Sequence, residues 1–168
     1  MNNTIRNEDA PTYNAIAKQQ NDDLLIANAI RALQQRLHVR GDCVSCPEDV
    51  RNLIRLSLAG SKNEAFCAMF LRTDHSLIAQ EQLFTGSIDC ASVYPRVIAQ
   101  RALTHNAAAI IIYHNHPSGK ATPSGADREL TKRIVEAMKL IDVRVLDHMV
   151  VGGDAEMKIE SFAELGYM

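Results

Sequence analysis

Long apolar segments are missing from this sequence. No hydrophobic run approaches the ~18 residues that a membrane-spanning helix needs. Residues 1–21 also lack an apolar segment flanked by basic residues, so they do not have the pattern of a secretory signal. We therefore expect a cytoplasmic protein that does not associate with a membrane.

Cysteines are scarce, and neither sign of charge predominates. Four cysteines in 168 residues do not form the dense pattern of a disulfide framework, so reduced intracellular thiols are the better interpretation. The 18 basic and 20 acidic residues leave a net charge of −2. This balance provides no overall attraction to nucleic acid, although it is compatible with a local basic groove.

The chain does contain enough apolar residues for one ordinary globular domain. Its hydrophobic fraction is 46% and its charged fraction is 23%, both typical of globular proteins of this length. Residues 1–21 are rich in Asn and Gln, and we expect them to form a flexible polar arm. Residues 22–60 predict an N-terminal helical extension, and residues 61–168 predict the main domain.

The extension contains signals for two helices. The first is expected to start at Asp22 and to end near Gly41, because apolar residues recur at helical spacing between them. The second is expected after residues 45–49, where a capping residue precedes Pro47 and acidic residues follow in the first turn. Its apolar side consists of Val50, Leu53, Ile54 and Leu58.

The main domain alternates between strand and helix patterns. Residues 65–71 predict a strand buried on both faces, and turn residues connect it to a second strand at 77–84, which indicates a hairpin. The remaining elements are expected as a helix at 93–104, a strand at 107–113, a helix at 124–140, and strands at 143–151 and 157–159. This order predicts an α/β (α+β) fold with a mixed β-sheet flanked by helices.

Two histidines follow the most apolar strand. In an extended chain, positions i and i+2 point to the same side, so His114 and His116 can reach one ion. Asp127 can be brought back by the intervening loop, and these ligand types suit zinc with one open coordination position. Ser124 and Asp127 also resemble a helix capping box, which is compatible with a metal-binding carboxylate.

The spacing His-x-His-Pro, then Ser124 and Asp127, resembles the JAMM motif of the JAB/MPN metalloenzyme superfamily. The longer string His114-Asn115-His116-Pro117-Ser118-Gly119, with Leu146-Asp147-His148 further on, resembles its bacterial RadC branch. The similarity extends from about Glu64 to the carboxyl end. It implies a mixed sheet flanked by helices, a single zinc, and a link to DNA repair.

The resemblance also implies a role for each site residue. His114, His116 and Asp127 hold zinc, which lowers the pKa of a coordinated water toward ~7. Glu64 accepts the proton of that water, and Ser124 donates a hydrogen bond to the developing oxyanion. Glu81 is a competing acid, but it lies inside a predicted strand and does not match the motif.

Several other residues have weaker signals. Cys43 and Cys46 have zinc-finger or redox spacing, but no second pair lies near them. His148 matches the family, and both a place near the site and a place in the core remain open. Fewer than seventy residues precede Glu64, and they show no helix-hairpin-helix pattern of the kind that longer RadC proteins use for DNA. We therefore interpret the chain as a short form of the family.

Three functions remain open from the sequence. The first is a zinc-dependent hydrolase, most readily a metallopeptidase or isopeptidase that cuts a protein or peptide substrate. The second is a metal-dependent nuclease or DNA-processing factor, which the near-neutral charge does not favour. The third is a non-enzymatic interaction module with bound metal. A homodimer formed through the first helices is compatible with each of them.

Overall fold

One mixed β-sheet forms the centre of the protein. The structure is a computed structural model that describes residues 10–39, 47–61, 63–86, 93–153 and 157–168. Within these residues the sheet has the strand order β2-β1-β3-β4-β5, with the strands β1 (Ala65–Leu71), β2 (Leu77–Thr85), β3 (Ala109–His116), β4 (Arg144–Gly152) and β5 (Ile159–Ser161). β3 and β4 run parallel, and the other neighbouring pairs are antiparallel. The predicted mixed sheet and the β1–β2 hairpin are therefore confirmed.

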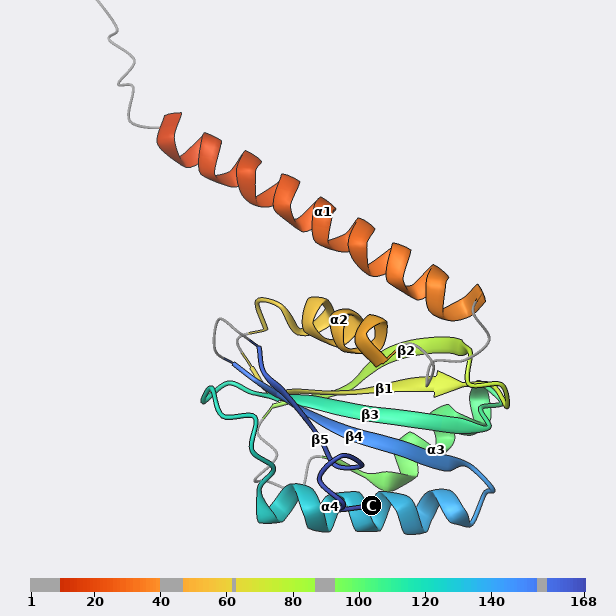
Figure 1. The fold of residues 1–168 in the computed structure, drawn as a ribbon. Coiled ribbons are helices and arrows are strands. Elements are labelled where there is room, and N and C mark those ends of the chain that lie inside the picture. The colour runs from red at the N-terminus through yellow and green to blue at the C-terminus, as the bar shows by residue number, and fades with distance from the viewer. Residues whose placement is uncertain (1–9, 40–46, 62, 87–92, 154–156) are drawn as a thin grey trace, which may run out of the picture.

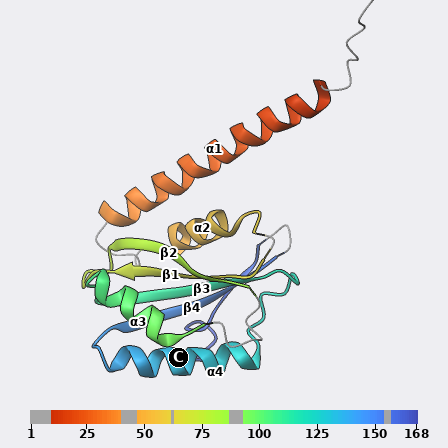
Figure 2. The same ribbon diagram turned by 180° about the vertical axis from the view of Figure 1, so that it is seen from behind.

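Helices cover both faces of this sheet (Figures 1 and 2). α2 (Pro47–Leu58) and the C-terminal end of α1 (Ala10–Val39) lie on one face, whereas α3 (Pro95–Thr104) and α4 (Gly125–Lys139) lie on the other. Side chains alternate along β1 and β3, so each strand contributes to a separate hydrophobic core on each face. Tyr113 belongs to the α2 side, and Ile112 belongs to the α4 side.

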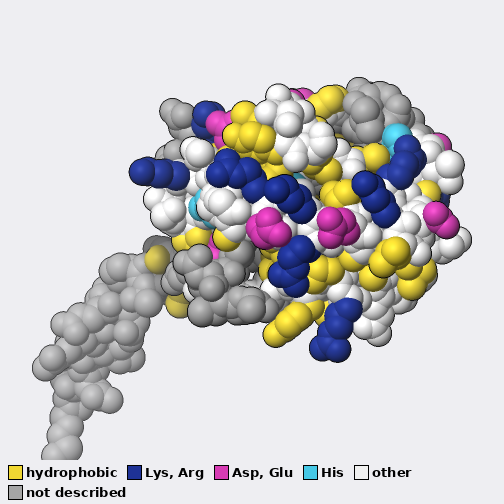
Figure 3. All heavy atoms as spheres, turned by 90° about the horizontal axis from the view of Figure 1, so that it is seen from below, with side chains coloured by type: hydrophobic (Ala, Val, Ile, Leu, Met, Phe, Trp, Pro, Cys, Tyr) yellow, Lys and Arg dark blue, Asp and Glu magenta, His cyan; other side chains and the backbone are white. Residues whose placement is uncertain are grey.

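α4 is an amphipathic helix in the layer that α3 and α4 form on one face of the sheet. Its apolar residues Leu130, Ile134 and Met138 are buried against the sheet. Its outward face is charged, and the view from below shows Lys and Arg side chains with Asp and Glu side chains among them (Figure 3). This division is the expected pattern of an amphipathic helix that covers one face of a sheet.

α1 differs from its predicted extent. It begins at Ala10 rather than at Asp22, so residues 10–21 of the expected polar arm are helical. Pro11 stands in the first turn, where its missing N–H costs no hydrogen bond, and the residues that follow contain no glycine or further proline. Residues 1–9, the helix end at Gly41 and the cap before Pro47 lie outside the described residues, and the proposed division into domains stays a prediction.

Two strands are also shifted from their predicted positions. β3 was expected at 107–113 but continues to His116. Its last residues remain paired, because His114 lies opposite β1 and residues 114–116 lie opposite β4. β5 was expected at 157–159 but begins at Ile159, since Met157 has a positive φ of 45° that an extended strand does not allow. Among the described residues, no helix is both long and apolar enough to cross a bilayer.

Candidate metal centre

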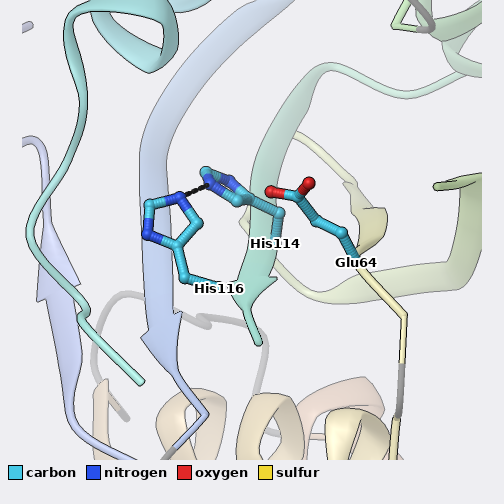
Figure 4. Close-up of side chains that lie close together, drawn as sticks. All are labelled: Glu64, His114 and His116. Atoms are coloured by element: carbon cyan, nitrogen blue, oxygen red, sulfur yellow. Dashed lines mark hydrogen bonds between the residues drawn. The ribbon is translucent and has the colours of Figure 1, made fainter. Parts of the chain in front are cut away.

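The end of β3 presents both predicted histidines on one face of the sheet. His114 and His116 lie two residues apart on the strand, so both rings point toward the α4 side. Their Nε2 atoms are 2.9 Å apart (Figure 4). The His114 side chain is fully buried, whereas 16% of the His116 side chain is exposed. The site is therefore anchored in the core and opens on the His116 side.

Asp127 reaches the histidines from the first turn of α4. Its Oδ1 lies 3.3 Å from Nε2 of His114, and its Oδ2 lies 3.5 Å from Nε2 of His116. A capping box holds this carboxylate: the Ser124 N–H donates to Oδ2 at 2.6 Å, and the Asp127 N–H donates to Oγ of Ser124 at 3.1 Å. The sequence predicted this cap, and the structure shows that the capping carboxylate also faces both histidines.

Glu64 enters the site from the residue before β1. Its carboxylate and the two histidine rings offer ligand atoms that all lie within 4.8 Å of one another. Figure 4 shows the Glu64 side chain directed toward His114. The structure thus brings Glu64, His114, His116 and Asp127 together from three separate elements. Ser124 joins them through its bonds to Asp127.

Asn115 is a site residue that the sequence reasoning missed. Its side chain is on the opposite face of β3 from the two histidines and is 4% exposed. Its Oδ1 accepts a hydrogen bond from the Ala65 N–H at 2.7 Å, and its Nδ2 donates to the Asn63 carbonyl at 3.2 Å. These two hydrogen bonds fix the position of the backbone on both sides of Glu64. Strand alternation could have placed Asn115 on that face, but it could not have predicted the contact of Asn115 with the backbone across the sheet.

The arrangement of hydrogen-bonding groups fits a bound cation. Nδ1 of His116 lies 2.8 Å from the Lys120 carbonyl, which only accepts, so this nitrogen carries the proton and Nε2 of the neutral ring has a free lone pair. That lone pair faces the Asp127 carboxylate and the His114 ring. Donor atoms ~2.0–2.1 Å from one tetrahedral zinc lie roughly 3.3–3.4 Å apart. The separations of 3.3 and 3.5 Å, which involve different oxygens of Asp127, are close to this spacing, whereas the two Nε2 atoms, 2.9 Å apart, would move slightly apart around an ion.

The electrostatics of the site also favour positive charge. Burial raises the pKa of Asp127, but whenever a proton instead of a metal ion occupies Nε2 of His114 or His116 the ring donates to this carboxylate, which outweighs burial and holds the pKa well below its usual range. The hydrogen bond to Asp127 raises the pKa of His116 above its ordinary value, against the opposing effect of burial. Both shifts have the same origin, an ionised carboxylate that stabilises a cation in front of it.

A glycine pair at the end of β4 makes room for the loop that follows His116. A Cβ on Gly152 would lie 2.7 Å from the Gly119 carbonyl oxygen, and one on Gly153 would lie 2.8 Å from the His116 carbonyl oxygen. Because both contacts involve backbone, a larger residue would displace the loop. The glycines therefore help to set the position of the second histidine.

His148 lies behind the site, in the core. Its ring is fully buried, and burial lowers its pKa well below the ordinary value. Its Nε2 is 2.9 Å from Nδ1 of His114, and its Nδ1 is 2.6 Å from Oγ1 of Thr131. His148 thus contacts the edge of the His114 ring that faces away from Asp127. Thr131 had no sequence signal, because it is one of many polar residues on a helix.

The structure does not bring Glu81 into this group. Its carboxylate binds Arg101 at 2.7 Å and His105 at 2.7 Å. The hydrogen bond from Arg101 lowers the pKa of Glu81 to about 2. Cys67 is buried in β1, and the predicted pair Cys43 and Cys46 lies outside the described residues.

The mixed sheet flanked by helices is consistent with a JAB/MPN-type domain, and two strand histidines in it face an aspartate on the next helix. A family model described as "RadC-like JAB domain" matches residues 44–167. The chain therefore belongs to the RadC-like JAB family, and the resemblance noted in the sequence is confirmed.

The chain is similar to relatives of about its own length and to longer ones. The UPF0758 protein YkfG of Escherichia coli K12 is 46% identical over 147 residues, which are 88% of this chain and 91% of the relative. The UPF0758 protein YeeS of the same strain is 44% identical over 144 residues, 86% of this chain and 95% of the relative. A UPF0758 protein of Thiobacillus denitrificans is 50% identical over 128 residues, 76% of this chain but 56% of that longer protein.

Proposed function

We propose that this chain is a zinc-dependent hydrolase of the metallopeptidase or isopeptidase kind. The observation that supports it most is the convergence of two imidazole nitrogens and a buried carboxylate, with a second carboxylate beside them. His114, His116 and Asp127 would hold the ion. Asp127 suits the role of ligand because it is buried and locked by its cap, whereas Glu64 lies half-buried at the opening.

Zinc bound here would act as a Lewis acid that makes water acidic and polarises a carbonyl group. Glu64 would accept a proton from the attacking water and deliver it to the leaving nitrogen. Its place at the start of β1, with its backbone held by Asn115, would keep the carboxylate beside the reacting atoms.

Ser124 would stabilise the oxygen that becomes negative during the reaction. Its Oγ accepts from the Asp127 N–H, which leaves the hydroxyl proton available for donation. The residue is exposed at the start of α4, where a substrate can approach. A single donor of this kind typically contributes ~10²–10³ to the rate.

Metal analysis with three variants tests the proposal. We expect wild-type protein to contain stoichiometric zinc and His114→Ala to lose it. Glu64→Gln should keep the zinc but lose ~10²–10⁴ in turnover, the usual contribution of a general base. Glu129→Gln is the matched control, because it removes an exposed carboxylate on the outside of α4. Wild-type protein without stoichiometric zinc, or full activity in Glu64→Gln, would refute the proposal.

A substrate screen identifies the bond that is cut. Peptides, isopeptide-linked conjugates, and single- and double-stranded DNA are incubated with wild type, His114→Ala and Glu64→Gln. We expect cleavage of an amide bond that both variants lose. If DNA alone is cleaved and both variants lose that activity, the chain is a metal-dependent nuclease and the peptidase proposal is wrong.

A further inference from the structure

A chain of buried hydrogen bonds starts at His114 and ends on the backbone of α4. Nδ1 of His114 lies 2.9 Å from Nε2 of His148, and Nδ1 of His148 lies 2.6 Å from Oγ1 of Thr131. The Thr131 hydroxyl donates to the Asp127 carbonyl at 2.6 Å. All three side chains are buried, so water does not offer them alternative partners.

The Asp127 carbonyl at the end of this series of hydrogen bonds determines which atom donates in each of them. A backbone carbonyl can only accept, so the Thr131 hydroxyl places its proton there and accepts from Nδ1 of His148. A neutral imidazole has one protonated nitrogen, so Nε2 of His148 is then an acceptor. It can accept only from a proton on Nδ1 of His114. Nε2 of His114 is consequently left with a lone pair that faces Asp127.

We propose that Thr131 and His148 are positioning residues that set the tautomer of His114 and so prepare its Nε2 for metal binding. The proposal rests on the proposed function only in taking Nε2 of His114 as a zinc ligand. Neither residue lies within the ligand group itself. They act through the far edge of one ligand ring, the place where an outer hydrogen bond fixes the orientation and basicity of a metal-binding histidine.

The surroundings of His148 keep its ring in one orientation. It stacks on Phe162 with centroids 4.6 Å apart and meets Phe66 edge-on at 5.8 Å. Phe66 also stacks on His114 at 6.0 Å. The aromatic contacts hold the two imidazoles side by side, and the Thr131 hydroxyl decides which nitrogen of His148 has the proton.

The sharpest test changes Thr131, whose hydroxyl hydrogen-bonds to His148 and to the backbone carbonyl of Asp127. Thr131→Val removes the hydroxyl but keeps the branched shape, and Thr131→Ser keeps the hydroxyl. Zinc dissociation constants of the metal-free full chain are measured by competition with a chromophoric chelator. We expect Thr131→Val to weaken zinc binding roughly 10–100-fold, and Thr131→Ser to stay close to wild type. Equal zinc affinity in wild type, Thr131→Val and Thr131→Ser would overturn the proposal.

A second pair of variants separates hydrogen bonding from packing at His148. Gln can accept with its oxygen and donate with its nitrogen, whereas Phe fills the aromatic pocket without either. We expect His148→Gln to bind zinc more tightly than His148→Phe. If both variants have the same affinity, His148 acts through packing alone and the proposal is wrong.

Nitrogen-15 NMR of the imidazole rings reads the tautomer without any reaction. In folded protein, metal-free and zinc-loaded, we expect His148 to be protonated at Nδ1 and unprotonated at Nε2. A proton on Nε2 of His148 in the loaded protein would reverse the direction of the chain and overturn the inference. If wild-type protein binds no zinc, the proposed function fails, yet the metal-free spectrum still tests this arrangement.

Discussion

Replacing Asn115 by leucine should loosen the backbone around Glu64 while leaving the metal ligands in place. The Asn115 side chain bonds to both neighbours of Glu64, whereas His114 and His116 point to the other face of β3. Leucine has the same branching with somewhat larger terminal groups, so the change removes hydrogen bonds without opening a cavity. The expected result is a less stable protein with zinc affinity close to that of wild type.

The cost follows from the two groups left behind. The Ala65 N–H is buried, and an unsatisfied buried donor costs ~1–3 kcal/mol. Asn63 is exposed, so water can replace the bond to its carbonyl and the further loss is small. We therefore expect the free energy of unfolding to fall by about 2 kcal/mol.

Urea denaturation of the zinc-loaded and metal-free forms measures this loss. Asn28→Leu is a matched control, because its side-chain bond to Arg31 lies on the exposed surface of α1 and its removal should cost less than ~0.5 kcal/mol. The reasoning fails if Asn115→Leu is as stable as the control. It also fails if zinc affinity falls in parallel with stability, since Asn115 would then support the ligands and not Glu64.

Three further changes test other parts of the structure. Gly152→Ala should lower the free energy of unfolding by ~1–3 kcal/mol and weaken zinc binding, because its Cβ would press on the loop after β3. The control is Gly125→Ala, whose Cβ meets nothing within 4 Å and which should change neither measurement. Glu81→Gln should cost about 1 kcal/mol at pH 7, a value reduced for the partial exposure of the Arg101 pair. The pKa of Glu81 is lowered to about 2 in the folded protein, so this carboxylate stabilises the fold fully above its pKa in the unfolded chain. The difference in the free energy of unfolding between Glu81→Gln and wild type should therefore vanish as the pH is lowered toward 2. Burial raises the pKa of Cys67 to about 11, so peptide mapping after iodoacetamide at pH 8 should find it unmodified in native protein and alkylated in urea; modification at equal rates would contradict its burial.

Much of the fold was readable because its central elements have simple local patterns. β1 occupies residues 65–71 as predicted, since a continuous apolar run suits a strand covered by helices on both faces. The extent of β3 was underestimated for the opposite reason. His114, Asn115 and His116 resemble a polar loop, and their pairing with neighbouring strands depends on residues far away in the chain.

The start of α1 was missed because the prediction followed apolar spacing. Among residues 15–38, whose side chains the structure describes, the fully buried residue Leu37 lies in the C-terminal part of the helix, whereas Ile16, Leu24 and Leu25 are exposed. Residues 15–21 of this helix are exposed, so they give no periodic apolar signal. Helix propensity and Pro11 in the first turn were the available cues.

The candidate site was predictable where its geometry is local. Strand alternation aligns His114 with His116, and the capping box directs Asp127, so each pair is arranged by residues that are neighbours in sequence. The contacts of Asn115 with the Asn63–Ala65 backbone and of His148 with His114 join separate elements of the sheet. Nothing in the local sequence specifies such partners.

This difference has a consequence for how the site responds to mutation. Asp127 serves the helix and the proposed ion with the same carboxylate: Oδ2 accepts from the Ser124 N–H while Oδ1 faces His114. The cap would persist without metal, so this ligand is oriented before binding and little ordering entropy opposes it. Glu64 lies outside any such cap: Asn115 holds the backbone on either side of it from across the sheet, and its own carbonyl accepts from the Gly86 N–H at 2.9 Å. We therefore expect metal affinity to resist substitutions that disturb the β1 start, and proton transfer by Glu64 to be the property that such substitutions remove first.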